Sequence, residues 1–203
     1  MKRVNLILLL DTSSSINGKK PGALIDASQN IVQMFISICE STVNLDGYIG
    51  AITFGRDISF FPLERAKDFT LVENEFNGTT QMGGMLKTLS EELSSSDVFT
   101  SVGDYKNIIV LFSDGGITDF SSDGYLSILR NPAFINSRRI AVAVGNRVNM
   151  HILSSFCTLS TDVFKTEDIE DVNDILRYTI NTLVSPKPSL KYERHDSGDT
   201  EWD

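Results

Sequence analysis

The sequence has few of the residues that build thiolate clusters or histidine-based catalytic sites, with two cysteines and two histidines among 203 residues. Cys39 and Cys157 are too few and too far apart for a metal–thiolate cluster. Each stands in an apolar pattern, so we expect buried, reduced thiols. His151 and His195 have no partner at ligand or catalytic spacing. A catalytic histidine is therefore not expected.

Positive charge and long apolar runs are also scarce. The 18 basic residues face 27 acidic ones, a net charge of −9, and no segment is rich in Lys and Arg, which argues against a nucleic-acid binder. No apolar run approaches the roughly 20 residues that span a bilayer. The run at 4–10 follows Lys2 and Arg3 as in a signal peptide, but it is short and ends at Asp11 without a small-residue cleavage site. We expect a cytoplasmic protein without a membrane segment.

What is present fits one large globular domain. Hydrophobic residues make up 41% and charged residues 22% of the chain, which are ordinary globular values, and this length can bury a core without a staple. The composition becomes polar and charged beyond Pro186. We expect a domain over 1–185 and a disordered acidic tail over 186–203.

Buried-type strands alternate with amphipathic helices along the chain. The pattern predicts strands at 4–10, 48–54, 58–63, 107–112, 139–144 and 163–164, and helices at 24–40, 85–93, 125–129, 152–156 and 172–184. Such alternation implies crossovers and an α/β fold with a doubly wound, mostly parallel sheet. The tight turn at 55–57 predicts one antiparallel edge hairpin.

Two of these strands lead into an aspartate. Asp11 follows Leu10, and Asp114 follows Ser113. Ligands of open α/β sheets bind at the carboxyl ends of the strands, so we expect both carboxylates to reach one crevice. Two carboxylates that close together repel unless a cation or a proton neutralises them.

Hydroxyl groups surround the same predicted crevice. Ser13 and Ser15 follow Asp11 at alternating positions, and in an extended loop their side chains would point the same way as its carboxylate. A loop before the helix at 85–93 adds Thr79 and Thr80. Hydroxyl and carboxylate oxygens are hard ligands that suit Mg²⁺, Mn²⁺ or Ca²⁺ rather than zinc.

Three segments carry a family resemblance. Asp11-Thr12-Ser13-Ser14-Ser15 resembles the DxSxS motif of von Willebrand factor A domains, residues 78–83 resemble their threonine loop, and residues 112–119 resemble their third motif. The motifs stand in the family's order, and the resemblance covers 1–185. It implies a Rossmann-like fold and a metal-ion-dependent adhesion site (MIDAS) formed by Asp11, Ser13, Ser15, Thr80 and Asp114.

The resemblance also implies how such a site works. Ser13 and Ser15 would bind one divalent cation directly, Mg²⁺ above all, while Asp11 and Asp114 would act largely through water and Thr80 directly or through water. The under-neutralised ion would then attract an Asp or Glu of a partner protein. This describes a binding module rather than an enzyme. The hairpin and residues 113–119 look most like the bacterial TerY-like branch, which implies a tellurite-resistance-like stress or defence system with a co-encoded kinase or phosphatase as partner.

Structural alternatives remain open for several of these residues. The serines at 13–15 could cap the helix that Pro21 begins, and Asp114 could be an ordinary Asp-Gly turn residue. Thr79 could replace Thr80 after a one-residue slip. Asp119 could shape its own loop or lie near the metal.

Functional alternatives also remain. One is a Mg²⁺-dependent phosphoryl-transfer or hydrolase enzyme with Asp11 as nucleophile, but the second acid that such enzymes want two residues on is replaced by Ser13. The other is a structural subunit of the same family without a functional metal. A hypothesis from the family resemblance is that the helix at 172–184 slides when the metal gains an anionic ligand.

Overall fold

A six-stranded sheet forms the centre of the computed structural model, which describes residues 2–71, 75–95, 105–119 and 122–184. The strand order is β3-β2-β1-β4-β5-β6, and every neighbouring pair is parallel except the antiparallel pair β2–β3. The strands are β1 (Lys2–Asp11), β2 (Leu45–Phe54), β3 (Ile58–Arg65), β4 (Tyr105–Ser113), β5 (Arg138–Ala143) and β6 (Val163–Lys165). The predicted fold class, including the antiparallel edge hairpin, is confirmed.

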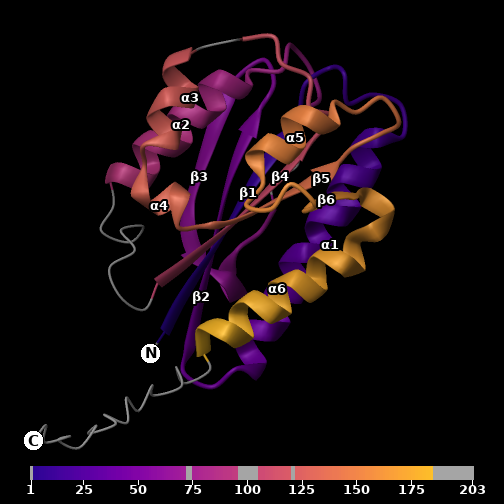
Figure 1. Cartoon of the computed structure of the whole chain (residues 1–203). Helices are drawn as coiled ribbons and strands as arrows, with labels where there is room; N and C mark the ends of the chain where they lie inside the picture. The colour runs from indigo at the N-terminus through magenta and orange to yellow at the C-terminus, as the bar shows by residue number, and fades with distance from the viewer. Residues whose placement is uncertain (1, 72–74, 96–104, 120–121, 185–203) are drawn as a thin grey trace, which may run out of the picture.

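Helices cover both faces of this sheet (Figure 1). The helices are α1 (Lys20–Ser41), α2 (Met82–Ser95), α3 (Ser122–Leu129), α4 (Pro132–Ile135), α5 (Met150–Phe156) and α6 (Ile169–Val184), with 3₁₀ turns η1 (Ala66–Asp68) and η2 (Thr166–Asp168). Apolar residues of α1 and α6 pack on one face, and those of α2 to α5 pack on the other.

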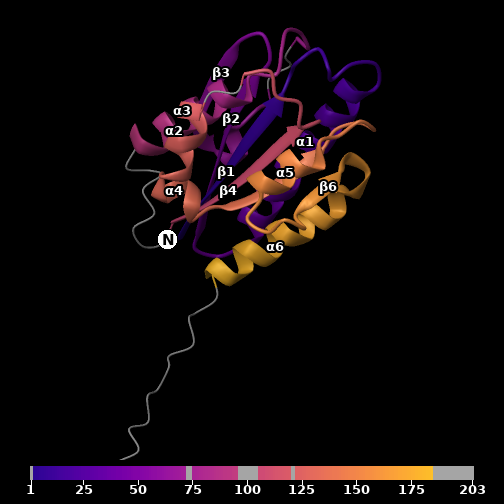
Figure 2. The ribbon, with the colours of Figure 1, turned by 45° about the horizontal axis from the view of Figure 1, so that its top comes forward.

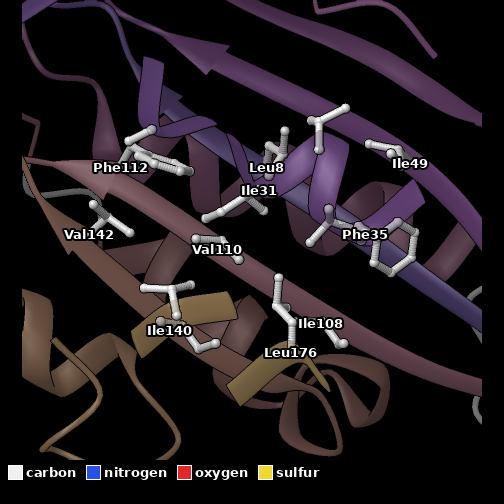
Figure 3. Packing of buried hydrophobic residues seen from close by; sticks show 14 of the residues in the cluster. Leu8, Ile31, Phe35, Ile49, Ile108, Val110, Phe112, Ile140, Val142 and Leu176 are labelled. Atoms are coloured by element: carbon white, nitrogen blue, oxygen red, sulfur yellow. The ribbon is translucent and has the colours of Figure 1, made fainter. Parts of the chain in front are cut away.

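Alternation along β1 shows why both faces need cover. Leu6, Leu8 and Leu10 pack toward α1 and α6, whereas Ile7 and Leu9 pack toward α2, and all five are at most 3% exposed. A continuous apolar run is what a strand buried on both faces requires. Figure 3 shows the first of these layers, where residues of α1 and α6 meet those of β1, β2, β4 and β5.

The structure differs from the prediction at the bounds of several elements and in one helix. The threonine loop ends at Gln81, because Met82 to Gly84 already belong to α2. The short helix α4 was not predicted, and Asn131 starts it by accepting hydrogen bonds from two backbone amides of its first turn. Helix α6 begins at Ile169 rather than at 172. The predicted tail at 186–203 lies outside the described residues.

The central strands β1 and β4 are neighbours, and their carboxyl ends lie side by side (Figure 2). Leu10 pairs with Phe112 in register, so Asp11 and Ser113 leave the sheet together. Here the chain order reverses, with β2 on one side of β1 and β4 on the other. Such a switch point is where open α/β sheets bind their ligands.

In the part of the chain that the structure describes, none of the helices combines the length and apolar character that crossing a bilayer requires.

Candidate metal site

Asp11 is the last residue of β1 and is fully buried. One carboxylate oxygen accepts the backbone N–H of Ser13 at 3.0 Å, and the other accepts the Ser113 hydroxyl at 2.6 Å. Burial raises the pKa of Asp11, the hydrogen bonds from Ser113 and Ser13 oppose this shift, and the negative charge of Asp114 adds to it. Two acidic groups thus interact at this point.

The serine hydroxyls converge just above Asp11. Ser13 Oγ lies 2.9 Å from Ser15 Oγ. Ser13 is buried, whereas Ser15 is exposed. The expected reason for this convergence was wrong, because the segment is a turn rather than an extended strand: the N–H of Ile16 donates to the Ser13 carbonyl at 3.0 Å. A turn brings the two hydroxyls together as well as an extended loop would.

The threonine loop adds a third hydroxyl. Thr80 is 4% exposed, and its Oγ1 donates to Ser13 Oγ at 3.0 Å, whereas Thr79 is exposed. The one-residue slip toward Thr79 is therefore not what the structure shows. The carbonyl of Thr80 accepts hydrogen bonds from Thr118, through its hydroxyl at 2.8 Å and its N–H at 3.2 Å. This contact ties the second loop to the third.

Asp114 approaches from the third loop. Its Oδ1 accepts the N–H of Gly116 at 3.0 Å, and a Cβ placed on Gly116 would meet both Asp114 Oδ1 at 3.1 Å and Thr80 Oγ1 at 3.6 Å. Gly115 has φ +73°, a left-handed conformation that favours glycine. The bond to Gly116 is that of an Asp-Gly turn, and Gly116 also brings this turn next to the threonine loop.

Two of the structural alternatives concern Asp119 and a capping role of the serines at 13–15. Both carboxylate oxygens of Asp119 accept backbone amides of α2, from Gly83 at 2.9 Å and from Gly84 at 2.8 Å. A negative charge at this end of α2 also interacts favourably with the positive end of the helix dipole. Helix α1 has Lys19 as its N-cap and receives no side-chain capping bond. The serines at 13–15 therefore do not cap α1.

Lys20 was missed in the sequence analysis. Its ammonium group donates to the Ser15 carbonyl at 2.8 Å and lies 3.8 Å from Asp114 Oδ2. Its stem packs against Gly145, where φ is +94° and an added Cβ would lie 2.4 Å from Lys20 Cε. A lysine directly before a proline carries no sequence signal for this role, because the contact joins the start of α1 to the loop after β5.

The chemistry of these side chains fits one hard cation. Among the described residues, no three His, Cys, Asp or Glu side chains gather in a way that could hold a metal, so a cation at this edge would depend on hydroxyls. Ser13, Ser15 and Thr80 present three hydroxyl oxygens, with two carboxylates beside them. Such an all-oxygen set suits Mg²⁺, Mn²⁺ or Ca²⁺.

Comparison with known families and curated proteins gives one match. The model of the von Willebrand factor type A domain matches residues 5–177. No curated protein matches the sequence.

Solved structures share the fold at low sequence identity. Proximal thread matrix protein 1 from the mussel byssus, in a structure with a zinc-occupied MIDAS motif, has a TM-score of 0.63 and 19% identity over 87% of this chain and 47% of that chain. The pilus adhesin SpaC from Lactobacillus rhamnosus GG has a TM-score of 0.66 and 13% identity over 89% of this chain and 30% of that chain. BatB from Bacteroides thetaiotaomicron has a TM-score of 0.58 and 12% identity over 89% of this chain and 98% of that chain. The chain spans about half the length of the mussel protein.

Proposed function

Because the chain belongs to the von Willebrand factor type A domain family, we propose that it binds one divalent cation at this site and uses the cation to bind a carboxylate of a partner protein. The observation that carries the proposal is the meeting of three loops: Thr80 donates to Ser13 at 3.0 Å, Ser13 lies 2.9 Å from Ser15, and the charge of Asp114 acts on Asp11.

The hydrogen bonds of the two aspartates support a role through water. Both oxygens of Asp11 and one of Asp114 already accept bonds from the protein. Ser13, Ser15 and Thr80 would then contact the ion, and the carboxylates would hold its water ligands. An ion held mainly by neutral hydroxyls keeps much of its charge, which favours an Asp or Glu side chain as an additional ligand. Mg²⁺ is the proposed ion, with Mn²⁺ or Ca²⁺ as substitutes.

The burial of Asp11 argues against the enzymatic alternative. A nucleophile must reach the atom it attacks, whereas Asp11 is 0% exposed and both its oxygens accept hydrogen bonds. We therefore propose a binding module and not an enzyme. A phosphatase assay with Asp11→Asn as control should detect no activity that depends on Asp11.

The finer assignment is also a proposal. The sequence resemblance to the TerY-like branch suggests a bacterial cytoplasmic stress or defence system, tellurite-resistance-like, with a co-encoded kinase or phosphatase as the partner. A pull-down from the native host with Mg²⁺ and with EDTA would identify that partner.

The test of metal binding uses a matched pair of aspartates. Asp114→Asn should abolish Mg²⁺ and Mn²⁺ binding in isothermal titration and abolish partner capture, while circular dichroism shows an intact fold. Asp119→Asn removes the same charge at the α2 start, where the carboxylate caps the helix, and should keep Mg²⁺ binding.

Two results would count against the proposal. Partner capture that persists in EDTA would remove the role of the ion. Equal Mg²⁺ affinity in Asp114→Asn and in the unchanged protein would leave a structural subunit without a functional metal as the better description.

A further inference from the structure

A groove of about 690 Å³ opens directly beside the candidate metal site and shares Ser15 and Asp114 with it. The start of α1, the loop after β5 and η2 form its walls, with Lys19, Arg147 and Glu167 among the lining residues. In Figure 1 the orange loop after β5 lies next to the indigo start of α1. A volume of this size falls in the range of about 300–1,000 Å³ that is usual for ligand sites.

The charge of this groove differs from that of the molecule. Its lining includes Lys19, Lys20 and Arg147 against Asp114 and Glu167, so it is net positive on a chain of net charge −9. The ammonium group of Lys20 already contacts Ser15 and lies near Asp114. Lys19 and Arg147 are exposed and form no ion pair with any residue that the structure describes.

Each of the two acidic residues that line the groove has another basic neighbour, with Asp114 3.8 Å from Lys20 and Glu167 4.0 Å from Lys165. Glu167 belongs to η2 and lies 4.0 Å from Lys165, an exposed pair in which its charge is partly offset. The α1 end of the groove has no acidic residue in the first helical turn, where the helix dipole adds positive potential. The charges of Lys19 and Arg147, which form no ion pair among the described residues, therefore favour an anion at this part of the groove.

From this arrangement we infer that the groove binds a partner segment with at least two carboxylates, one for the metal ion and a second one for Lys19 and Arg147. The inference rests on the proposed function, because it takes the first carboxylate to be the one on the ion. It adds that the partner is recognised by an acidic pair rather than by a single Asp or Glu.

The size of the groove favours a peptide over a small inorganic anion. A sulfate or phosphate ion at the metal would leave most of the 690 Å³ unfilled. A peptide can span the groove and place two carboxylates several residues apart. Charge complementarity of this kind sets partner choice and association rate more than it sets affinity.

The experiment measures the binding of synthetic peptides to the full chain by NMR shift perturbation at saturating Mg²⁺. One capped Gly-rich peptide carries a single Asp, and a set of others carries a second Asp one to four residues away. At least one diacidic peptide should bind about 3- to 10-fold more tightly than the single-Asp peptide, the gain expected of one or two exposed ion pairs. Its binding should shift amide signals of Lys19 and Arg147.

Matched variants test the role of the two cations. Lys19→Ala/Arg147→Ala should remove the advantage of the diacidic peptide and leave the affinities for Mg²⁺ and for the single-Asp peptide unchanged. Lys67→Ala/Arg130→Ala removes the same charges outside the groove and should keep the advantage. Lys19→Glu/Arg147→Glu should prefer a peptide whose second Asp is replaced by Lys.

The outcomes separate this inference from the proposed function. No preference for any diacidic peptide, equal loss with the control variant, or equal competition by sodium sulfate at matched ionic strength would overturn the groove inference while Mg²⁺-dependent binding of the single-Asp peptide stands. Failure of Mg²⁺ itself to bind would overturn the proposed function, and it would be seen first in the titration without peptide.

Discussion

Single residues in this crevice combine burial with charge. Asp11 is fully buried and Asp114 is 7% exposed, yet among the described residues only Lys20 lies within 4 Å of either as a countercharge. Two buried carboxylates with so little compensation are costly in a folded protein. A bound cation would remove much of this cost. The carboxylates that lower the stability of the metal-free protein are therefore suited to a metal site.

The two cysteines lead to a prediction about alkaline pH. Burial, aided by nearby acidic groups, raises the pKa of Cys39 and of Cys157 from 9.0 to about 12. Between these values the unfolded chain loses protons that the folded chain keeps, so the stability that the thiols contribute is complete below pH 9 and falls as the pH rises toward 12. Urea unfolding at pH 8 and at pH 10.5 should show this loss.

A cysteine-free variant is the control for that measurement. Cys39→Ala/Cys157→Ala should lose less stability over the same pH interval, since its lysines and tyrosines titrate as before. Equal losses in the two proteins would show that the thiols do not contribute. Slow alkylation of the native protein by iodoacetamide at pH 8 is expected for the same reason.

Among the elements, α1 and α6 connect the groove to the core. Helix α1 begins at the groove with Lys20, and η2, which lines the groove, leads directly into α6. The two helices also contact each other, where Asn173 Nδ2 donates to Asn30 Oδ1 at 2.8 Å. Asn173 Oδ1 is buried without a partner in the described structure, a cost of about 1–3 kcal/mol for such a group. A polar contact with one unpaired oxygen thus lies between α1 and α6 beside their apolar packing.

Hydrogen exchange tests whether α6 responds to ligand. We predict that Mg²⁺ together with a diacidic peptide changes the amide exchange of Ile169–Val184, while the exchange of β1 stays the same because its residues lie in the centre of the sheet. Mg²⁺ alone is the control. Identical protection of α6 in the metal-free protein, with Mg²⁺ alone and with Mg²⁺ and peptide would end the hypothesis that this helix moves.

For the whole molecule, the net charge of −9 and the metal site predict that Mg²⁺ stabilises the fold. An ion that binds only the folded chain adds about 2.7 kcal/mol to the free energy of unfolding at 100 times its Kd. The urea midpoint should therefore rise with the logarithm of the Mg²⁺ concentration, and Asp114→Asn should remove this rise.

General screening needs a separate control, because any salt weakens repulsion within an acidic protein. NaCl at the same ionic strength should raise the midpoint less than Mg²⁺ does, and equally in both proteins. A midpoint that Mg²⁺ and NaCl raise to the same extent would contradict a specific site.

Much of the fold followed from patterns within short segments. The apolar run before Asp11 predicted a strand buried on both faces, and β1 is that strand. Helical spacing predicted α1, and the turn at 55–57 predicted the β2–β3 hairpin. Helix α4 was missed, since four residues are too few for a periodic signal.

The amino-acid sequence by itself determined the alternation of strands and helices, and with it the end of the sheet at which Asp11, Ser13, Ser15 and Asp114 lie, whereas the family resemblance selected Thr80. Periodicity and strand-end position are local properties, so one sequence contains them. Only the tertiary structure decided that Lys20 contacts the site, that Asp119 caps α2 and that Lys19 and Arg147 share a groove. Each of these depends on how distant segments pack against each other, and no local pattern along the chain encodes such a distance.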